Sequence, residues 1–183
     1  MKAVLISIRP KWCQKIVNGK KTIEVRKTRP KLQTPFRCYI YRTKGTVSHI
    51  INGKWVKMKV GGTVIGEFTC DRIDEYDDDT IFSFRHEDYA RWNDFDLNRA
   101  CIHPEDFQNY ANGKWLYGWH ISGLKIYDKP RELREFTGLR QTKFGAEPVP
   151  ITRAPRCSRS RKSSRRSGRP CLPPAARRRH SAS

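Results

Sequence analysis

Residues 19–26 read Gly-Lys-Lys-Thr-Ile-Glu-Val-Arg, and this stretch decides how the N-terminal part of the chain folds. From Thr22 to Lys27 polar and apolar side chains alternate, which is typical of a β-strand. Residues 10–17 place apolar side chains at helical spacing and begin with a proline, which suits the first turn of a helix. Gly19 is placed to end that helix. The sequence therefore predicts a buried strand at residues 3–8, then a short helix, a glycine cap and a second strand.

The charged residues of this stretch allow two arrangements. If the whole stretch is extended, Thr22, Glu24 and Arg26 share one face of the strand and Lys21 lies on the other. If Lys21 instead belongs to the turn after Gly19, its amine points into the cleft between helix and sheet. Independently of where Lys21 lies, Glu24 and Arg26 form either a solvated ion pair contributing less than about 1 kcal/mol, or a site in which Glu24 orients a cation, Lys21 or Arg26, toward a phosphate or base edge.

The charge of the chain is strongly positive and unevenly spread. Its 183 residues include 38 Lys and Arg against 18 Asp and Glu, a net charge of +20. Residues 152–183 hold 11 of the cations and none of the acids, which leaves a net +9 in residues 1–151. Such a potential attracts polyanions, so a nucleic acid, whether RNA or DNA, is the expected partner. A membrane partner is not expected, because the basic run has almost no apolar residues.

The cysteines argue against a metal site and for a reducing compartment. All six occur singly, and none forms a Cys-x-x-Cys pair. Neither a zinc site nor a cofactor is therefore predicted. Four of them lie in apolar segments, as reduced cysteines acting as small hydrophobes do. The N-terminal apolar run is too short for a signal peptide or a membrane span, so a soluble cytoplasmic protein is expected.

The rest of the N-terminal three quarters is rich in strands. Asn52-Gly53 predicts a hairpin turn, and residues 74–79, an acidic run, are expected to form a solvated loop. The remaining expected elements are a short helix at 104–110 and strands at 36–41, 48–51, 55–60, 63–73 and 118–127. Since the long helices of a doubly wound sheet are missing, the pattern predicts a mixed α+β fold, built as a small, strongly bent β-barrel with a few short helices.

Aromatic residues alternate with cations along several of these strands. They are Tyr39, Tyr41, Trp55, Tyr117 and Trp119, interleaved with Arg37, Arg42, Lys54 and Lys57. Such a combination either stacks nucleic-acid bases or supplies the core of a small barrel, and the second interpretation is favoured for each residue. His120, on the last predicted strand, is expected to be a structural, hydrogen-bonded histidine.

The pattern Gly19-x-Lys21-x-x-Glu24-x-Arg26 resembles the signature of the ASCH domain family. Residues 63–73 and 116–136 are also similar to bacterial and phage members, so the resemblance covers residues 1–143. It implies a PUA-like β-barrel that binds RNA, another nucleic acid or a nucleotide. The motif would line a cleft beside the first helix, with Lys21, Thr22, Glu24 and Arg26 as the predicted nucleic-acid-binding residues.

The resemblance also raises two alternative functions. One branch of the family hydrolyses acetylated cytidine with a lysine and a threonine three residues apart. Lys21 matches the lysine, but Glu24 stands at the threonine position, and Thr22 is displaced by about 7 Å along a strand. Ribonuclease activity is attributed to other members. An enzyme of either kind would use Lys21 and Glu24 as its catalytic residues, so whether the chain is an enzyme stays open. The second alternative is an adaptor in a phage or mobile-element complex, with a protein partner of unknown kind.

Residues 144–183 differ in character from the rest. A Pro-rich linker is predicted first, followed by a tail of Arg, Ser, Pro and Ala that has too few apolar residues to fold. Two origins fit this tail equally well. It is either a genuine segment that binds phosphates without sequence preference, or the product of a shifted reading frame beyond about residue 154. Functional arguments therefore rest on residues 1–143.

Overall fold

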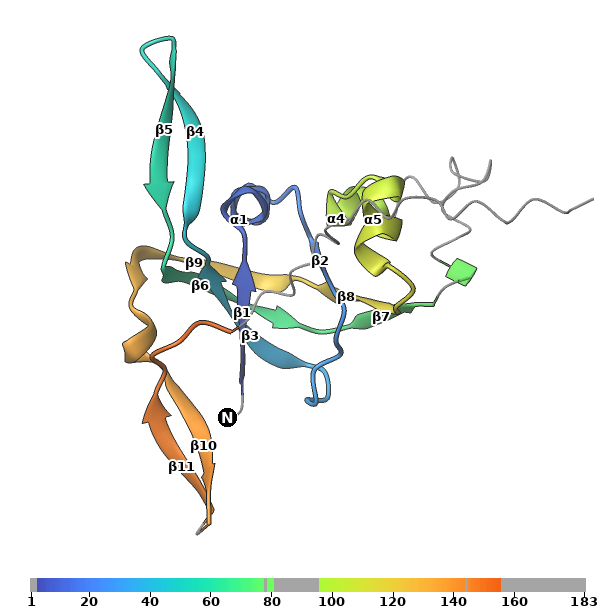
Figure 1. The fold of residues 1–183 in the computed structure, drawn as a ribbon, viewed down its shortest axis with the longest axis vertical. Coiled ribbons are helices and arrows are strands. Elements are labelled where there is room, and N and C mark those ends of the chain that lie inside the picture. Colours follow the sequence, from blue (N-terminus) through green and yellow to red (C-terminus); the bar gives the residue numbers. More distant parts are fainter. Residues whose placement is uncertain (1–2, 78, 81–95, 144, 156–183) are drawn as a thin grey trace, which may run out of the picture.

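A computed structural model describes residues 3–77, 79–80, 96–143 and 145–155. The basic tail beyond residue 155 and most of the segment after the acidic run lie outside these residues. Figure 1 shows short helices beside twisted strands, with two β-hairpins that project from opposite ends of the body. The expected mixed α+β class is confirmed, with strands dominating.

The first sheet has four strands in the order β1-β3-β6-β9. These strands are β1 (Ala3–Ile8), β3 (Phe36–Arg42), β6 (Thr63–Cys70) and β9 (Ser122–Arg131). β1 runs parallel to β3, whereas the other neighbours are antiparallel. The predicted strands at 3–8 and 36–41 are both confirmed. β1 lies at the edge of this sheet, and the chain leaves it directly into the first helix, α1 (Pro10–Val17).

The second sheet has three antiparallel strands in the order β2-β8-β7. These strands are β2 (Ile23–Arg26), β8 (Leu116–His120) and β7 (Ile73–Tyr76). The chain changes sheets after Cys70 and again at Ile121. The single strands predicted at 63–73 and 118–127 are therefore wrong, because each is divided between the two sheets. The start of the acidic run, predicted as a loop, is part of β7 because it pairs with β8.

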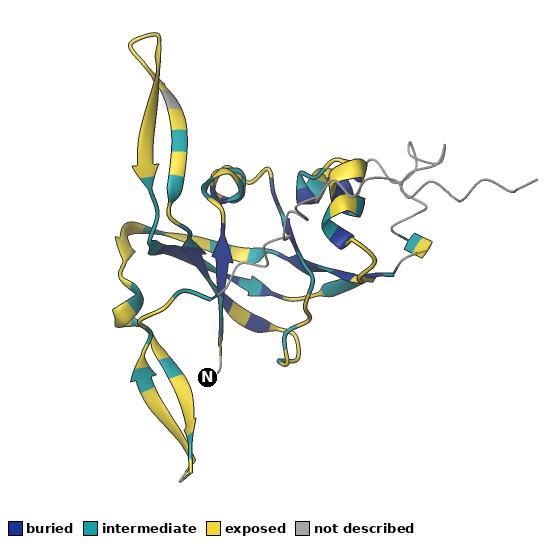
Figure 2. Cartoon of the chain, in the orientation of Figure 1, coloured by how far each residue is buried: buried dark blue, intermediate teal, exposed yellow. Residues whose placement is uncertain are grey.

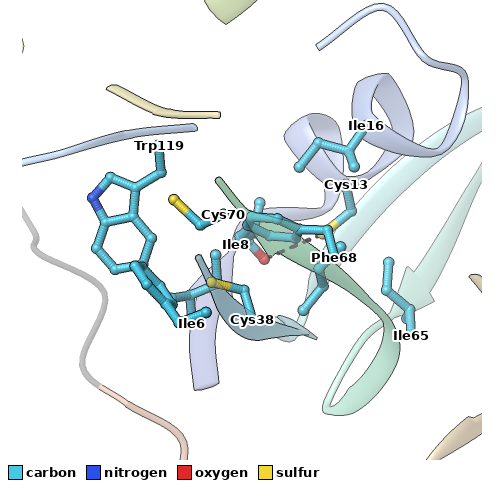
Figure 3. Packing of buried hydrophobic residues seen from close by; sticks show 11 residues of the cluster. Ile6, Ile8, Cys13, Ile16, Cys38, Ile65, Phe68, Cys70 and Trp119 are labelled. Atoms are coloured by element: carbon cyan, nitrogen blue, oxygen red, sulfur yellow. Dashed lines mark hydrogen bonds between the residues drawn. The ribbon is translucent and has the colours of Figure 1, made fainter. Parts of the chain in front are cut away.

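The main core packs the first sheet against α1 and β8, and it is made of small and branched apolar side chains with three large aromatic rings. Figure 3 shows Trp119 at one end of this cluster and Phe68 near its middle. Phe36 meets Trp119 edge to face, with ring centroids 5.7 Å apart. The fully or nearly buried members are Ile6, Ile8, Cys13, Ile16, Phe36, Cys38, Ile40, Ile65, Phe68, Cys70 and Trp119.

A second apolar cluster packs two short helices against β2 and its neighbours. The helices are α4 (Asp96–Ala100) and α5 (Pro104–Ala111), and α5 confirms the predicted short helix. Phe107 of α5 meets Tyr76 edge to face at 5.4 Å. The remaining buried members of this cluster are Ile23, Val25, Leu97, Ala100, Ala111 and Leu116. α4 and α5 are thereby held beside β2, across from α1 (Figure 1).

The first projecting hairpin pairs β4 (Gly45–Ile51) with β5 (Lys54–Val60). Asn52 and Gly53 both have positive φ, at 51° and 73°, as a tight hairpin turn requires. The hairpin turn predicted from Asn52-Gly53 is confirmed. At its foot Gly61 has a φ of 96°, and a Cβ there would lie 2.1 Å from the Thr43 carbonyl oxygen. Only glycine fits this close approach.

The second projecting hairpin corrects the prediction for the chain after residue 143. β10 (Thr137–Thr142) pairs with β11 (Gly145–Pro150), which follow the short 3₁₀ helix η1 (Leu133–Glu135). The segment predicted as the beginning of a Pro-rich linker is therefore a strand. Its prolines are tolerated because a two-stranded hairpin has only edge strands. Residues 151–155 then return to the body, where the Ser7 hydroxyl donates a hydrogen bond to the Pro155 carbonyl.

Two further predictions concern closure of the sheet and the thiols. The described strands are divided among four sheets that do not close on one another, so the barrel is not confirmed.

Cys13, Cys38 and Cys70 are buried free thiols, as predicted, and burial raises the pKa of Cys13 and of Cys70 to about 12. Within the described part of the chain, no helix has the length and apolar character needed to cross a membrane.

Candidate functional site

The turn between α1 and β2 brings the charged motif together. Gly19 adopts a φ of 70°, and its N–H donates to the Ile16 carbonyl at 2.9 Å. The Lys21 N–H then donates back to the Lys15 carbonyl at 3.0 Å, so Lys21 is still attached to the end of the helix. β2 begins only at Ile23. Of the two arrangements allowed by the sequence, the structure has the one in which Lys21 belongs to the turn.

Three charged side chains meet at this turn. The Lys21 amine lies 3.4 Å from one carboxylate oxygen of Glu24, and the Arg26 guanidinium lies 3.5 Å from the other. The Lys21 amine also donates to the Ala100 carbonyl at 2.7 Å, and Arg26 donates to the Ser7 carbonyl at 3.0 Å. Glu24 therefore lies between two cations, each of which is fixed by a backbone carbonyl. Glu24 and Arg26 therefore do not form the solvated ion pair that was one of the two alternatives from the sequence.

Burial makes these charges costly and fixes their positions. Lys21 is 2% exposed and Glu24 is 6% exposed. Loss of hydration lowers the pKa of Lys21 below that of an ordinary lysine, and the nearby Glu24 carboxylate opposes the shift. A buried ion pair of this kind is weak evidence for stability, because the cost of desolvation offsets the attraction. A buried lysine with a lowered pKa that lies next to a carboxylate is therefore a candidate functional residue.

A cavity of about 300 Å³ opens above this network, between α1, β2 and α5. We call it the α1–α5 cavity. Cationic, acidic, aromatic and amide side chains all contribute to its wall. Its lining residues are Ser7, Ile8, Arg9, Lys11, Trp12, Lys21, Glu24, Val25, Arg26, Ile102, Asp106, Asn109 and Tyr110. A volume of this size is at the lower end of the range for small-molecule sites.

Thr22, the fourth predicted binding residue, does not line this cavity. Its hydroxyl accepts a hydrogen bond from Arg99 at 3.1 Å, and its N–H donates to the Arg99 carbonyl at 2.8 Å. Arg99 also lies 3.4 Å from His120 Nδ1, while Asp74 lies 2.5 Å from His120 Nε2. Thr22 therefore ties β2 to α4, away from the cavity. His120 is hydrogen-bonded and 6% exposed, as expected of a structural histidine.

Sequence reasoning missed much of the cavity wall. Trp12 is one of the apolar residues at helical spacing in residues 10–17, for which only a role in the helix was predicted. In the structure the amines of Lys11, Lys15 and Lys21 lie 4.3, 5.0 and 5.2 Å from its ring centroid. Asp106, Asn109 and Tyr110, which line the cavity, follow i, i+3, i+4 spacing along α5, and this polar and aromatic stripe was the available signal. The fold brings α5 beside the motif from about 85 positions further along the chain.

Comparison with known proteins shows which protein family the chain belongs to. The family model described as "ASCH domain" matches residues 6–129, about two thirds of the chain. This chain belongs to the ASCH domain family. The resemblance predicted from the Gly19-x-Lys21-x-x-Glu24-x-Arg26 pattern is thereby confirmed. No curated protein matches this ASCH domain.

A solved structure of an ASCH protein shares the fold. A tyrosine-to-phenylalanine mutant of the ASCH protein from Zymomonas mobilis superposes with a TM-score of 0.51 at 19% identity, covering 72% of this chain and 77% of that one. The ASCH structure from the same organism without that mutation gives a TM-score of 0.49 at 21% identity and covers 70% and 72% of the two chains. At this identity the first likeness supports the ASCH fold and nothing further.

Proposed function

We propose that the α1–α5 cavity binds a nucleotide, free or as one unit of a single-stranded RNA. The observation that carries the proposal is a buried amine, Lys21, held between a carboxylate and a backbone carbonyl at the floor of a cavity with aromatic walls. Membership of a family whose domains are generally considered to bind nucleic acid supports the same proposal.

The charge of the cavity favours an anionic ligand. Its wall carries four cationic side chains, namely Arg9, Lys11, Lys21 and Arg26, against Glu24 and Asp106. The phosphate of a nucleotide is a suitable partner for the surplus, because charge-assisted hydrogen bonds to phosphate are strong. Glu24 would hold Lys21 and Arg26 in place so that their remaining N–H groups face the ligand.

The uncharged part of the wall favours a base. Trp12 and Tyr110 provide aromatic surface on α1 and α5, and Asn109 provides an amide with both a donor and an acceptor. Bases of single-stranded RNA stack on aromatic side chains and are recognised at their edges by such groups. Thr22 would act indirectly, through the hydrogen bonds that hold α4 and thereby the Ala100 carbonyl next to Lys21.

Binding of mononucleotides and short single-stranded oligonucleotides to the full chain tests this proposal. Lys21→Met keeps the length of the side chain but removes the amine, whereas Lys20→Ala removes an equal charge from an exposed neighbouring position. We expect Lys21→Met to weaken binding about tenfold and Lys20→Ala to change it less than about twofold. Equal losses in the two variants would show that only net charge matters. Paired ribo- and deoxyribonucleotides compare RNA with DNA.

One observation favours a second candidate, hydrolysis of a nucleoside amide or of RNA. The pKa of Lys21 is lowered by burial, and its amine lies 3.4 Å from the Glu24 carboxylate. A lysine that loses its proton more easily next to a carboxylate is suited to proton transfer. The full chain incubated with acetylated cytidine or with RNA, without added metal, should then show turnover that Lys21→Met lacks. Turnover no greater than that of Lys21→Met rejects the enzyme.

A further inference from the structure

The hairpin of β4 and β5 has two chemically different faces. Cross-strand partners share a face of an antiparallel pair, so the observed register sorts the side chains. One face, here named the cationic face, carries Thr46, Ser48, Ile50, Trp55, Lys57 and Lys59. The opposite face is mainly apolar and carries Val47, Ile51, Lys54, Val56, Met58 and Val60. Figure 2 shows that most of the hairpin is exposed.

The two faces differ in what lies beside them. At the foot of the hairpin, Val47 and Val60 of the apolar face line a cavity shared with Pro10 and Val17 of α1. The position of a Cβ on Gly45 would lie 3.0 Å from the Pro10 ring. The apolar face is therefore turned toward α1 at its foot. The lysines of the cationic face follow the other side of the hairpin.

The cationic face leads down to a second cavity that is also cationic. Lys59 and Thr46 line it together with Arg42, Lys44 and Thr63, and no acidic side chain contributes to its wall. Arg42 also lines the cavity beside α1, and its Nε is buried and has no hydrogen-bond partner among the described residues. A buried guanidinium N–H without a partner costs free energy, and the Arg42 side chain lines this second cavity. Phosphate oxygens are a natural acceptor for such a group.

The charge of this region is of one sign. Residues 43–62 contain Lys44, Lys54, Lys57 and Lys59 but no Asp or Glu. Near the tip of the hairpin Trp55 is 73% exposed and its cross-strand partner Ile50 is 61% exposed. An exposed tryptophan at one end of a line of cations resembles the arrangement by which proteins hold single strands, with bases on an aromatic ring and phosphates on a basic track.

We propose that the cationic face of the β4–β5 hairpin binds single-stranded nucleic acid. A base stacks on Trp55, and the backbone that follows contacts Lys57, Lys59 and then Arg42 at the foot. From Trp55 to the foot the strand spans about 17 Å at the usual rise per residue. A membrane touched by the tip would not reach the cations at the foot, and the stacked bases of a duplex offer no free face to Trp55. The proposal goes beyond the α1–α5 cavity and does not depend on it.

The decisive test compares two lysines on the same strand. Lys57→Ala removes a charge from the cationic face, and Lys54→Ala removes one from the opposite face. Binding of a fluorescent 20-nucleotide single strand to the full chain is measured over a range of salt. We expect Lys57→Ala to weaken binding about fivefold and to lower the slope of log affinity against log salt by about 0.7. Lys54→Ala should stay within about twofold. Equal effects of the two variants would overturn the proposal.

Trp55 gives an independent test. Trp55→Ala should weaken binding of the same oligonucleotide about tenfold, whereas Trp55→Phe, which keeps an aromatic face, should retain most of the affinity. Binding of a mononucleotide should be unchanged in all the hairpin variants, which separates this site from the α1–α5 cavity. Unchanged oligonucleotide binding by Trp55→Ala, equal affinity for a duplex, or binding to phosphatidylserine vesicles that is lost in Lys57→Ala would each contradict the proposal.

Discussion

The α1–α5 cavity and the β4–β5 hairpin use similar residues under opposite conditions. At the cavity floor Lys21 is 2% exposed and contacts the Glu24 carboxylate. On the hairpin Trp55 is 73% exposed, and Lys57 beside it is exposed as well. A buried charge has lost its hydration and is held by specific partners, so it offers a ligand a fixed geometry. An exposed charge keeps its hydration, and its flexible side chain can contact a ligand in many positions at little cost to the stability of the fold.

This difference implies different sensitivities. Substitutions in the cavity network should alter the stability of the fold, the affinity for the ligand and the pH dependence of both, because all of these depend on the contacts of Lys21 and Glu24. Changes on the hairpin should alter binding alone. The following predictions test that separation.

The largest effect is expected from Glu24→Gln. The substitution leaves the buried Lys21 and the partly buried Arg26 near each other without the carboxylate that lies between them. We expect the free energy of unfolding to fall by about 3 kcal/mol. The matched control is Glu147→Gln, because Glu147 is 53% exposed and lies 3.6 Å from Arg140 in a surface pair. The control substitution should lower the free energy of unfolding by less than about 1 kcal/mol. Urea denaturation monitored by circular dichroism measures both.

If Glu24→Gln were as stable as Glu147→Gln, the cavity network would behave as a surface network. The cavity network would then not differ from an exposed ion pair in its contribution to the stability of the fold.

An intermediate effect is expected on the pH dependence of anion binding. Because burial lowers the pKa of Lys21, this lysine loses its proton at a lower pH than an ordinary lysine. Affinity for adenosine monophosphate, titrated from about pH 7.5 to about pH 10, should therefore fall as the pH rises. Lys21→Met has no proton to lose at this position, so its weaker binding should change less over the same range. Calorimetric titration of both proteins makes the measurement.

The linked effect on stability has the opposite sign. A lysine whose pKa is lowered in the folded state binds its proton more weakly there than in the unfolded chain. Stability should therefore rise with pH between the lowered value and the ordinary value of 10.5. Thermal melting should show a smaller rise for Lys21→Met. The same pH dependence in the two proteins would place its origin at another group.

The smallest effect is expected from Trp55→Ala on stability. The side chain buries little area, so the free energy of unfolding should change by less than about 0.5 kcal/mol. Trp119→Ala provides the contrast, because Trp119 is 3% exposed and packs in the core against Phe36. Its removal should cost about 3 to 5 kcal/mol. A large loss of stability in Trp55→Ala would mean that the hairpin is packed against the body.

Local chemistry in the sequence predicted the elements that position the motif. Gly19 ended α1 as expected because only a residue tolerant of positive φ fits there, and Asn52-Gly53 formed the β4–β5 turn for the same reason. The strand breaks near Arg72 and at Ile121 were missed. No proline marks either break, although Asp71 and Arg72 interrupt the polar and apolar alternation and Gly123, two positions after Ile121, has a φ of 54°. The alternation records burial and does not say which sheet a strand joins.

The cavity itself was only half predictable. Lys21, Glu24 and Arg26 are close in the sequence, and their spacing indicated that they interact. The opposite wall comes from α5, and the carbonyl that fixes Lys21 comes from Ala100. Such contacts depend on how β2 pairs with β8 and packs against α4, which no local pattern specifies. The Pro-rich strand β11 was missed because proline argues against a strand unless both partners are edges.

The hydrogen bond from the Ser7 hydroxyl to the Pro155 carbonyl has a practical consequence. Ser7 also lines the α1–α5 cavity and accepts a hydrogen bond from Arg26 through its carbonyl. The end of the described chain is thus fastened to a residue of the cavity wall. A dye, an affinity tag or a fused domain attached directly after Pro155 would begin next to the proposed nucleotide. The same position suits a reporter of occupancy and is poorly suited to a purification handle.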